Sequence, residues 1–175
     1  MKLALDCYEC LRRLLCQAAD LATDDVSLKQ RATEEAKKIL DNEFSYSQLS
    51  IVIATKIHKI VREVTNNTDP YRAMKEREMT LARELYPELS SRYKDDLRSC
   101  LKLAAAANAI DFFRETSSIK DNIREPVRFA IDDSEQFEAK LKDAGKVIYL
   151  ADNAGELYFD LPLVKWMKQF AQVIY

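Results

Sequence analysis

The segment Val147-Ile-Tyr-Leu-Ala-Asp-Asn-Ala-Gly-Glu156 decides the fold that this sequence predicts. A short apolar run ends in Asp152-Asn153, a glycine follows, and an amphipathic stretch begins directly afterwards. A second apolar run, from Gln172 to Tyr175, comes after that stretch. The order strand, helix, strand is one β-α-β unit, and such a unit implies a parallel sheet.

The boundaries of this unit follow from the change in hydrophobic period. We expect a strand from Lys146 to Ala151, a loop from Asp152 to Gly155, a helix from about Glu156 to Ala171 and a strand from Gln172 onward. Pro162 leaves two alternatives open. Either Asp160 caps a helix that starts near the proline, or the proline lies within one continuous helix and kinks it.

Helical periodicity dominates the sequence before this unit, because apolar positions recur at steps of three and four. The pattern predicts helices over residues 3–22, 26–40, 45–64, 70–86 and 95–113. Ser45 and Gln48 form an expected capping box, Asp69-Pro70 starts the fourth helix, and Tyr86-Pro87 ends it. Asp95 or Asp96 opens the fifth.

A polar break over residues 116–125 separates these helices from the carboxyl-terminal part. An extended stretch over residues 127–131 and a short helix capped at 132–134, which ends at Gly145, follow the break. We therefore predict an α+β protein with an all-α helical domain over residues 1–120 and the beginning of an α/β domain with parallel strands over residues 121–175. We expect this second domain to be truncated, because the sequence stops inside the second strand.

The composition is that of a globular protein of 175 residues, with 47% hydrophobic and 32% charged residues. A net charge of −2 gives no bulk attraction to phosphate backbones, so we expect no nucleic-acid partner. Apolar runs are shorter than the roughly 20 residues of a membrane span, and charge comes too early for a signal peptide. The expected location is cytoplasmic.

The end of the first strand carries the chemistry. In a parallel α/β sheet, ligands bind beyond the carboxyl ends of the strands, where the next helix offers free amides to an anion such as phosphate. Asp152 and Asn153 supply hard oxygen ligands suited to Mg²⁺ or Mn²⁺. Gly155 lets a bound group approach the backbone, and Glu156 and Asp160 add carboxylates. The alternative is that Asp152-Asn153 is only a cap and turn.

The residues Asp152-Asn-Ala-Gly-Glu-Leu-Tyr-Phe-Asp160 resemble the signature of the damage-control phosphatases, formerly domain of unknown function 89. Cys7-x-x-Cys10, Asp69-Pro-Tyr-Arg-Ala-Met-Lys75 and Asn108-Ala-Ile-Asp111 fit in the same order. The paired cysteines resemble the stand-alone prokaryotic branch of that family. The resemblance implies a helical domain followed by a Rossmann-like α/β domain.

The same resemblance implies the roles of the site residues. Asp152 and Asn153 fall on the metal ligands, Glu156 and Asp160 on the acidic residues of the signature, and Asn108 and Asp111 on residues that face the cleft. The implied reaction removes phosphate from small phosphorylated metabolites, such as sugar phosphates or damaged metabolites. A divalent metal (Mg, Mn, Co or Ni) would polarise the phosphoryl oxygens and activate water.

This sequence departs from the family pattern in three places. Ala107 precedes Asn108 where glycine is more frequent, and Pro162 interrupts a helix that is usually free of proline. A later metal-binding aspartate and a phosphate-binding lysine would lie beyond Tyr175. We interpret the sequence as the amino-terminal portion of such a phosphatase.

Four cysteines, Cys7, Cys10, Cys16 and Cys100, are enough for one zinc site. On an ideal helix Cys10 lies roughly 60° from Cys7 while Cys16 lies roughly 180° away, so a shared site would require an unwound first turn. One interpretation is zinc binding or a redox pair at Cys7 and Cys10. The other is that these cysteines are simply buried in reduced form. His58 is the only histidine, so a histidine-based zinc hydrolase or a Ser-His-Asp triad elsewhere is hard to build.

Two other classes of function stay open. One is an inactive fragment or helical interaction module that forms an oligomer through the exposed edge of its unfinished sheet. The other is an S-adenosylmethionine-dependent carboxyl methyltransferase, against which the single glycine after the strand argues. Sequences typical of dinucleotide and P-loop sites, G-x-G-x-x-G and G-x-x-x-x-G-K-[ST], do not occur.

Overall fold

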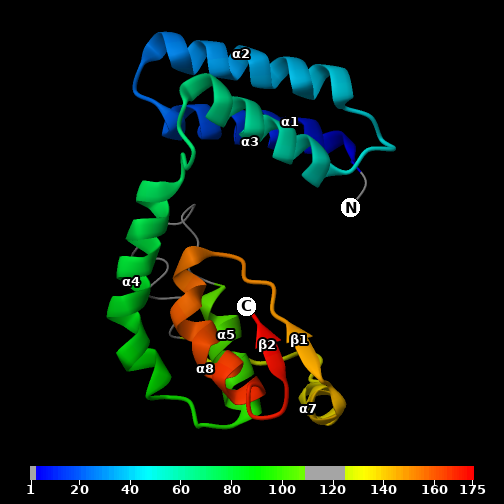
Figure 1. Ribbon diagram of the computed structural model, residues 1–175, viewed down its shortest axis with the longest axis vertical. Helices are drawn as coiled ribbons and strands as arrows, with labels where there is room; N and C mark the ends of the chain where they lie inside the picture. The colour runs from blue at the N-terminus through cyan, green and yellow to red at the C-terminus, as the bar shows by residue number, and fades with distance from the viewer. Residues whose placement is uncertain (1–2, 109–124) are drawn as a thin grey trace. The chain divides into compact units, whose positions relative to one another are not determined.

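The computed structural model describes residues 3–108 and 125–175 of the chain. It confirms the predicted α+β class: helices make up most of the described residues, and two short parallel strands form one sheet. The elements, labelled in Figure 1, are α1 (Leu5–Ala22), α2 (Val26–Glu43), α3 (Ser50–Thr65), α4 (Arg72–Ser90), α5 (Leu97–Ala107), α7 (Ser134–Asp143), β1 (Lys146–Ile148), η1 (Ala154–Glu156), α8 (Leu157–Met167) and β2 (Gln172–Ile174). Within the described residues, no helix has both the length and the apolar character needed to cross a bilayer.

The chain divides into two compact units, Met1–Ala73 and Met74–Tyr175. The predicted domain boundary between residues 120 and 121 lies outside the described residues and stays a prediction.

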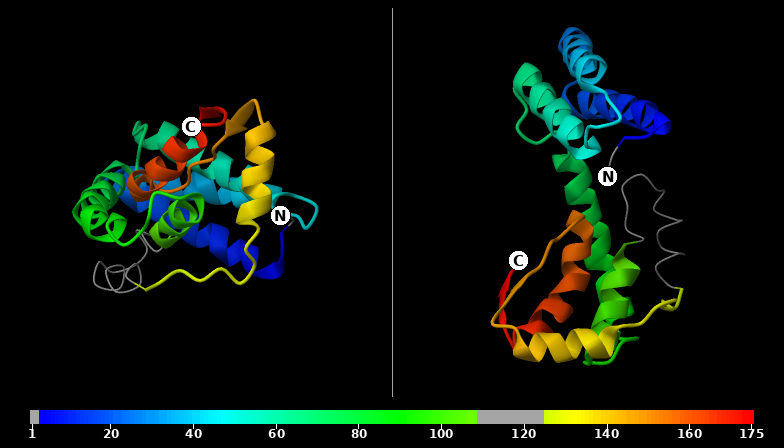
Figure 2. Two further views of the ribbon diagram at one scale, coloured as in Figure 1. Left: turned by 90° about the horizontal axis from the view of Figure 1, so that it is seen from below. Right: turned by 90° about the vertical axis from the view of Figure 1, so that its right-hand side faces the viewer.

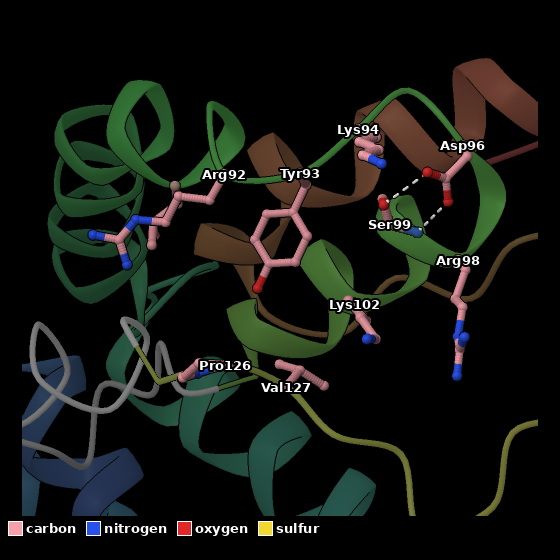
Figure 3. A pocket seen from close by; sticks show the side chains of 10 residues that line it. Arg92, Tyr93, Lys94, Asp96, Arg98, Ser99, Lys102, Pro126 and Val127 are labelled. Carbon is pink, nitrogen blue, oxygen red and sulfur yellow. Dashed lines mark hydrogen bonds between the residues drawn. The ribbon is translucent and has the colours of Figure 1, made fainter.

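Two helices begin directly after an aspartate whose side chain caps the first helical turn. Asp25 caps α2 by accepting a hydrogen bond from the amide of Leu28 at 2.9 Å. Of the two candidates for α5, Asp96 is the cap: its carboxylate accepts from the amide of Ser99 at 2.8 Å and from the Ser99 hydroxyl at 2.9 Å (Figure 3). Both aspartates satisfy amide groups that the first helical turn leaves without partners.

Two predicted helix starts are wrong. The capping box at Ser45 and Gln48 does not form, because the Gln48 carbonyl accepts from the amide of Leu3 at 3.2 Å and α3 begins only at Ser50. The fourth helix begins at Arg72 instead of Pro70, after a turn in which the Arg72 amide donates to the carbonyl of Asp69 at 3.2 Å. In both places the chain is held by a neighbouring backbone group before the helix starts.

The predicted stop at Tyr86-Pro87 is wrong, and the structure also bears on the alternatives at Pro162. α4 continues through Pro87 to Ser90, because Leu85 and Leu89 on either side are buried in one apolar cluster. Pro162 lies inside the continuous helix α8, which settles the two alternatives in favour of the second. Each proline removes one helical hydrogen bond, and burial of the neighbouring side chains offsets that loss.

The segment between the helical part and the sheet is also less regular than predicted. The extended stretch over residues 127–131 forms no strand. The helix α7 ends at Asp143, and Ala144 leaves it in an extended conformation with φ −81° and ψ 127°. Gly145 has no positive φ, so the turn does not depend on the conformational freedom of glycine.

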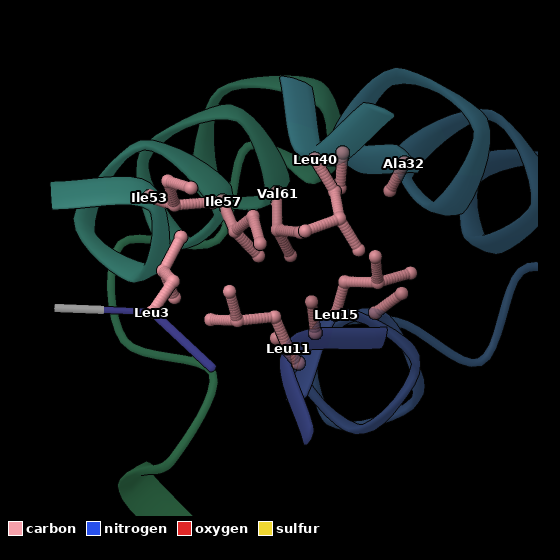
Figure 4. Close-up of a cluster of buried hydrophobic side chains, with 12 residues drawn as sticks. Leu3, Leu11, Leu15, Ala32, Leu40, Ile53, Ile57 and Val61 are labelled. Atoms are coloured by element: carbon pink, nitrogen blue, oxygen red, sulfur yellow. The ribbon is translucent and has the colours of Figure 1, made fainter. Parts of the chain in front are cut away.

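The first unit is a bundle of α1, α2 and α3, each packed against the other two (Figure 1). Its core is drawn in Figure 4 and is built from apolar side chains spaced three or four residues apart on each helix. These residues include Leu11, Leu15, Ala32, Leu40, Ile53, Ile57 and Val61. The spacing confirms the predicted buried stripes.

The second unit places α8 against both α5 and the parallel strands (Figure 2). Lys146 pairs with Gln172 and Ile148 with Ile174. Val147, Tyr149 and Val173 pack toward the helices, whereas Ile148, Leu150 and Ile174 are 68%, 87% and 46% exposed. This alternation is the two-residue period of a strand with one covered face.

Burial of one isoleucine in α3 should stabilise the first unit measurably. Ile57 is fully buried, and Ile57→Ala is expected to lower the free energy of unfolding by about 2–5 kcal/mol. Ile51 lies on the same helix and is 66% exposed, so Ile51→Ala should change it by less than about 0.5 kcal/mol. Urea unfolding followed by circular dichroism measures both, and equal effects would contradict the assigned core.

Candidate functional site

The predicted site begins where β1 ends. The pairing of the strands extends one residue past β1, because the amide of Tyr149 donates to the carbonyl of Ile174 at 2.8 Å. Leu150 and Ala151 then lead to Asp152, whose side chain is exposed beyond the carboxyl end of the strand. The following residues form η1, which runs directly into α8. Asp152 therefore lies between a strand end and a helix start, as the sequence predicts.

Asn153 and Glu156 hold each other in place. The Asn153 side-chain amide donates through Nδ2 to Oε1 of Glu156 at 2.9 Å, and the Glu156 backbone amide donates to the Asn153 carbonyl at 3.2 Å. These contacts fix the orientation of the Asn153 amide and leave its oxygen, Oδ1, on the opposite side of the group. The Asn153 amide is therefore held in one orientation, with its oxygen free to accept.

Glu156 is a buried carboxylate, 5% exposed. Burial raises its pKa, the hydrogen bond from Asn153 opposes the rise, and the negative charges of Asp152, Asp160 and Glu78 add to it. Gly155, beside it, is also buried. A carboxylate that shares its surroundings with other acids gains from a nearby cation.

Asp160 lies one turn further along α8 and is 3% exposed. Its two oxygens accept hydrogen bonds from the hydroxyl of Tyr149 at 2.8 Å and from that of Tyr175 at 3.2 Å. The two tyrosine rings stack with centroids 5.4 Å apart and planes 11° from parallel. Burial raises the pKa of Asp160, and both hydroxyl donors oppose that rise.

A cavity of about 450 Å³ is lined by Asp152, Glu156 and Asp160, whereas Asn153 is not among its described lining residues. It lies among α5, α7, β1 and α8, and its walls are mostly apolar side chains. Asn108, at the end of α5, lines it together with Asp152, Glu156 and Asp160. Its size is within the range of small-molecule sites, which commonly combine apolar walls with a few convergent polar groups. Asp111, the other predicted cleft residue, lies outside the described residues.

The polar groups suit a hard divalent cation with few protein ligands. Asp152 and Asn153 offer carboxylate and amide oxygens, which Mg²⁺ and similar ions prefer, and such ions commonly keep several waters. In residues 3–108 and 125–175 no group of three or more His, Cys, Asp or Glu side chains is arranged to hold a metal. Asp152 and Asn153 alone give two oxygen ligands, and an ion bound to them would need water or substrate oxygens to complete its coordination.

Three of the four cysteines are in the first compact unit and one is in the second. Cys7 and Cys10 are free thiols on intact helical turns of α1, and Cys7 accepts a hydrogen bond from the amide of Ala4 at 3.3 Å. Cys16 is also on α1, whereas Cys100 is buried in the second unit, where burial raises the pKa of its thiol. Zinc binding or redox pairing of Cys7 and Cys10 stays a prediction.

Sequence reasoning missed the two tyrosines. The signal was available in the period of the strands, because Tyr149 follows Val147 by two residues and Tyr175 follows Val173 by two. Both tyrosines therefore share the covered face of the sheet, next to α8. A buried Asp160 in α8 requires hydrogen-bond donors, and these hydroxyls are the donors within its reach.

The fold and the site define an α+β protein whose polar residues converge beyond the carboxyl end of a parallel strand, in a cavity of small-molecule size. Residues 3–175 match the family described as Damage-control phosphatase ARMT1-like domain, and the chain belongs to this family. This result confirms the family resemblance of the signature around Asp152.

Similar proteins match the chain over nearly its whole length. A damage-control phosphatase of Archaeoglobus fulgidus is 29% identical over 97% of this chain and 62% of its own length. A damage-control phosphatase of Pyrococcus horikoshii is 26% identical over 98% of this chain and 61% of its own length. The crystal structure of a DUF89 family protein from Pyrococcus horikoshii matches with a TM-score of 0.82 at 24% identity, over 99% of this chain and 62% of that one. The chain thus spans about three-fifths of the length of these relatives.

Removal of the charge on Asp160 should change the titration of the tyrosines that bind it. Burial and the Asp160 carboxylate raise the pKa of Tyr149 and raise that of Tyr175 to about 12. Asp160→Asn keeps the size of the side chain but removes the charge, so tyrosinate should form at lower pH. Absorbance of tyrosinate near 295 nm measures the shift.

The sign of the pH dependence follows from the same contacts. In the folded chain the hydroxyls keep their protons above pH 10, the ordinary tyrosine pKa. Stability from this arrangement is present below about pH 10 and is lost as pH rises through the folded pKa near 12. An unchanged tyrosinate curve in a folded Asp160→Asn variant would show that Asp160 does not act on these hydroxyls.

Proposed function

We propose that this chain forms the metal-binding part of a phosphatase that hydrolyses small phosphorylated metabolites, such as sugar phosphates or damaged metabolites. The observation that carries the proposal is the convergence of Asn108, Asp152, Glu156 and Asp160 on one cavity beyond β1. Family membership supports the same class of reaction. We infer further that the α/β part is Rossmann-like in the complete domain.

The surroundings of Asp152 favour a phosphate group. The amino-terminal end of α8 and the preceding turn η1 lie next to Asp152, and the positive end of a helix dipole attracts anions. Gly155 is in that turn, where the backbone has no side chain between it and a bound group. Asn108 reaches the cavity from the end of α5.

Asp152 and Asn153 are the residues that would hold a divalent metal: Mg, Mn, Co or Ni. When bound, such an ion stabilises negative charge on phosphoryl oxygens and supplies an activated water. Asp152 contributes the charge, and Asn153 contributes the oxygen that Glu156 orients. Asp160, held by two tyrosines, is a further acid in the wall of the cavity.

A second candidate function is an interaction module. The side chains Ile148, Leu150 and Ile174 form an exposed apolar face on the two-stranded sheet, and this face favours association with another protein or another copy. This function would survive Asp152→Ala, and the chain would sediment as an oligomer. A monomer in sedimentation at all concentrations would exclude it.

Asp152 should be indispensable for hydrolysis. Asp152→Asn removes the only full charge among the two expected metal ligands, so metal-dependent hydrolysis of p-nitrophenyl phosphate should fall to the background rate. The assay uses Mg²⁺, Mn²⁺, Co²⁺ or Ni²⁺ with an EDTA blank, and circular dichroism checks the fold. Asp143→Asn, at the exposed end of α7, is the matched control and should keep full activity.

Two results would contradict the proposal. The first is metal-dependent hydrolysis that persists in Asp152→Asn. The second is a folded wild-type chain that binds none of the four metals in a calorimetric titration.

Glu156 should act on metal affinity through Asn153. Glu156→Ala removes the acceptor that orients the Asn153 amide, and the loss of such a supporting hydrogen bond commonly weakens metal binding about 10–100-fold. Glu156→Gln keeps an acceptor oxygen for Nδ2 and should lose less affinity. Calorimetric titration with Mn²⁺ measures both, and equal losses would show that the charge of Glu156, not the orientation of Asn153, matters.

A further inference from the structure

A second cavity, of about 490 Å³, lies in the same compact unit. Its walls come from the end of α4, the turn after it, the first half of α5 and residues 126–127. None of its described lining residues also lines the cavity beyond β1. From α5 it takes Arg98, Ser99 and Lys102, which are on a different face of that helix from Leu101, Ala104 and Asn108.

The cavity is strongly basic in a chain whose net charge is −2. Four cationic side chains line it, Arg92, Lys94, Arg98 and Lys102, against the single acid Asp96. The carboxylate of Asp96 already accepts two hydrogen bonds from Ser99 as the cap of α5. A concave surface that gathers one sign of charge concentrates ions of the opposite sign.

The two arginines have acidic partners, but the two lysines do not. Arg98 pairs with Asp132 at 2.6 Å, and Arg92 pairs with Glu88 at 2.5 Å and points away from Tyr93 in Figure 3. Within residues 3–108 and 125–175, neither Lys94 nor Lys102 forms a hydrogen bond or an ion pair. Lys102 is nevertheless half-buried and four residues from Arg98, a like-charged spacing that destabilises a helix unless an anion is near.

Tyr93 forms an aromatic wall of the cavity. In Figure 3 its ring lies to one side of Lys94 and Lys102, and Val127 lies below the ring. The turn after α4 fixes Tyr93, because its amide donates to the carbonyl of Ser90 at 3.2 Å and its side chain packs on the buried cluster around Leu89. An aromatic ring in a cavity wall can pack against a flat or apolar group of a ligand and remove it from water.

We propose that this cavity binds a phosphorylated small molecule with a planar body, such as a nucleoside phosphate. The phosphate lies between Lys94 and Lys102, which donate charge-assisted hydrogen bonds, and the body rests on Tyr93 and Val127. The cavity is separate from the site beyond β1. Occupancy here therefore does not require the metal or the reaction proposed there.

The test uses the 175-residue chain in EDTA, with adenosine diphosphate, pyrophosphate and adenosine as probes. Calorimetry or amide chemical shifts measure the dissociation constant of each probe. Adenosine diphosphate should bind more tightly than pyrophosphate, and adenosine should bind most weakly. Binding of both anions should weaken as salt is raised, because the contacts are ionic.

Variants locate the binding. Lys102→Met keeps the aliphatic stem and should weaken binding of adenosine diphosphate roughly tenfold, the effect of one lost charge-assisted hydrogen bond. Lys165→Met, at an exposed position of α8, is the matched control and should change it less than about twofold. Asp152→Asn should bind adenosine diphosphate like the wild type, which separates this cavity from the site beyond β1.

Four results would overturn the proposal. The first is that neither adenosine diphosphate nor pyrophosphate binds at millimolar concentration. The second is that adenosine and adenosine diphosphate bind equally well. The third is unchanged affinity in a folded Lys102→Met variant. If Asp152→Asn alone abolished binding, the ligand would belong to the site beyond β1 and the proposal would also fail.

Discussion

The hydrogen bonds between Asp160 and two tyrosines hold the carboxyl-terminal unit together. A buried carboxylate is unfavourable without donors, and its two donors come from the ends of two different strands, Tyr149 after β1 and Tyr175 after β2. Asp160 therefore fixes α8 to both strands at once. Since η1 precedes α8 directly, the same contacts determine where Asn153 and Glu156 lie. The position of the candidate site is thus a consequence of the hydrogen bonds that Asp160 accepts.

The strand-helix-strand unit could be predicted from sequence because its signals are local. The alternation around Val147 and the apolar run at Gln172 give strand starts that the structure keeps, and Asp152 at the strand end follows from the same pattern. The family signature also leads to Asn108, which the structure places in the same cavity as Asp152. Local pattern and motif were sufficient for these residues.

The errors arise where contacts between distant residues override local preference. Ser45 and Gln48 have the composition of a capping box, yet a hydrogen bond from Leu3 holds Gln48 outside the helix. Tyr86-Pro87 was expected to end its helix and Pro162 left two alternatives open, but burial of neighbouring leucines keeps both helices continuous. The basic cavity beside Tyr93 was missed for a related reason, because Lys94 and Lys102 come together with Val127 only when the chain folds.

The uncovered face of the sheet has a consequence for how the chain behaves in water. Ile148, Leu150 and Ile174 expose apolar surface to water, and removal of such surface from water is entropically driven near room temperature. Contact between such faces therefore weakens on cooling and strengthens in sulfate, which is excluded from protein surfaces. The chain should therefore stay unassociated in the cold at low salt and associate on warming. Light scattering at several temperatures would test this.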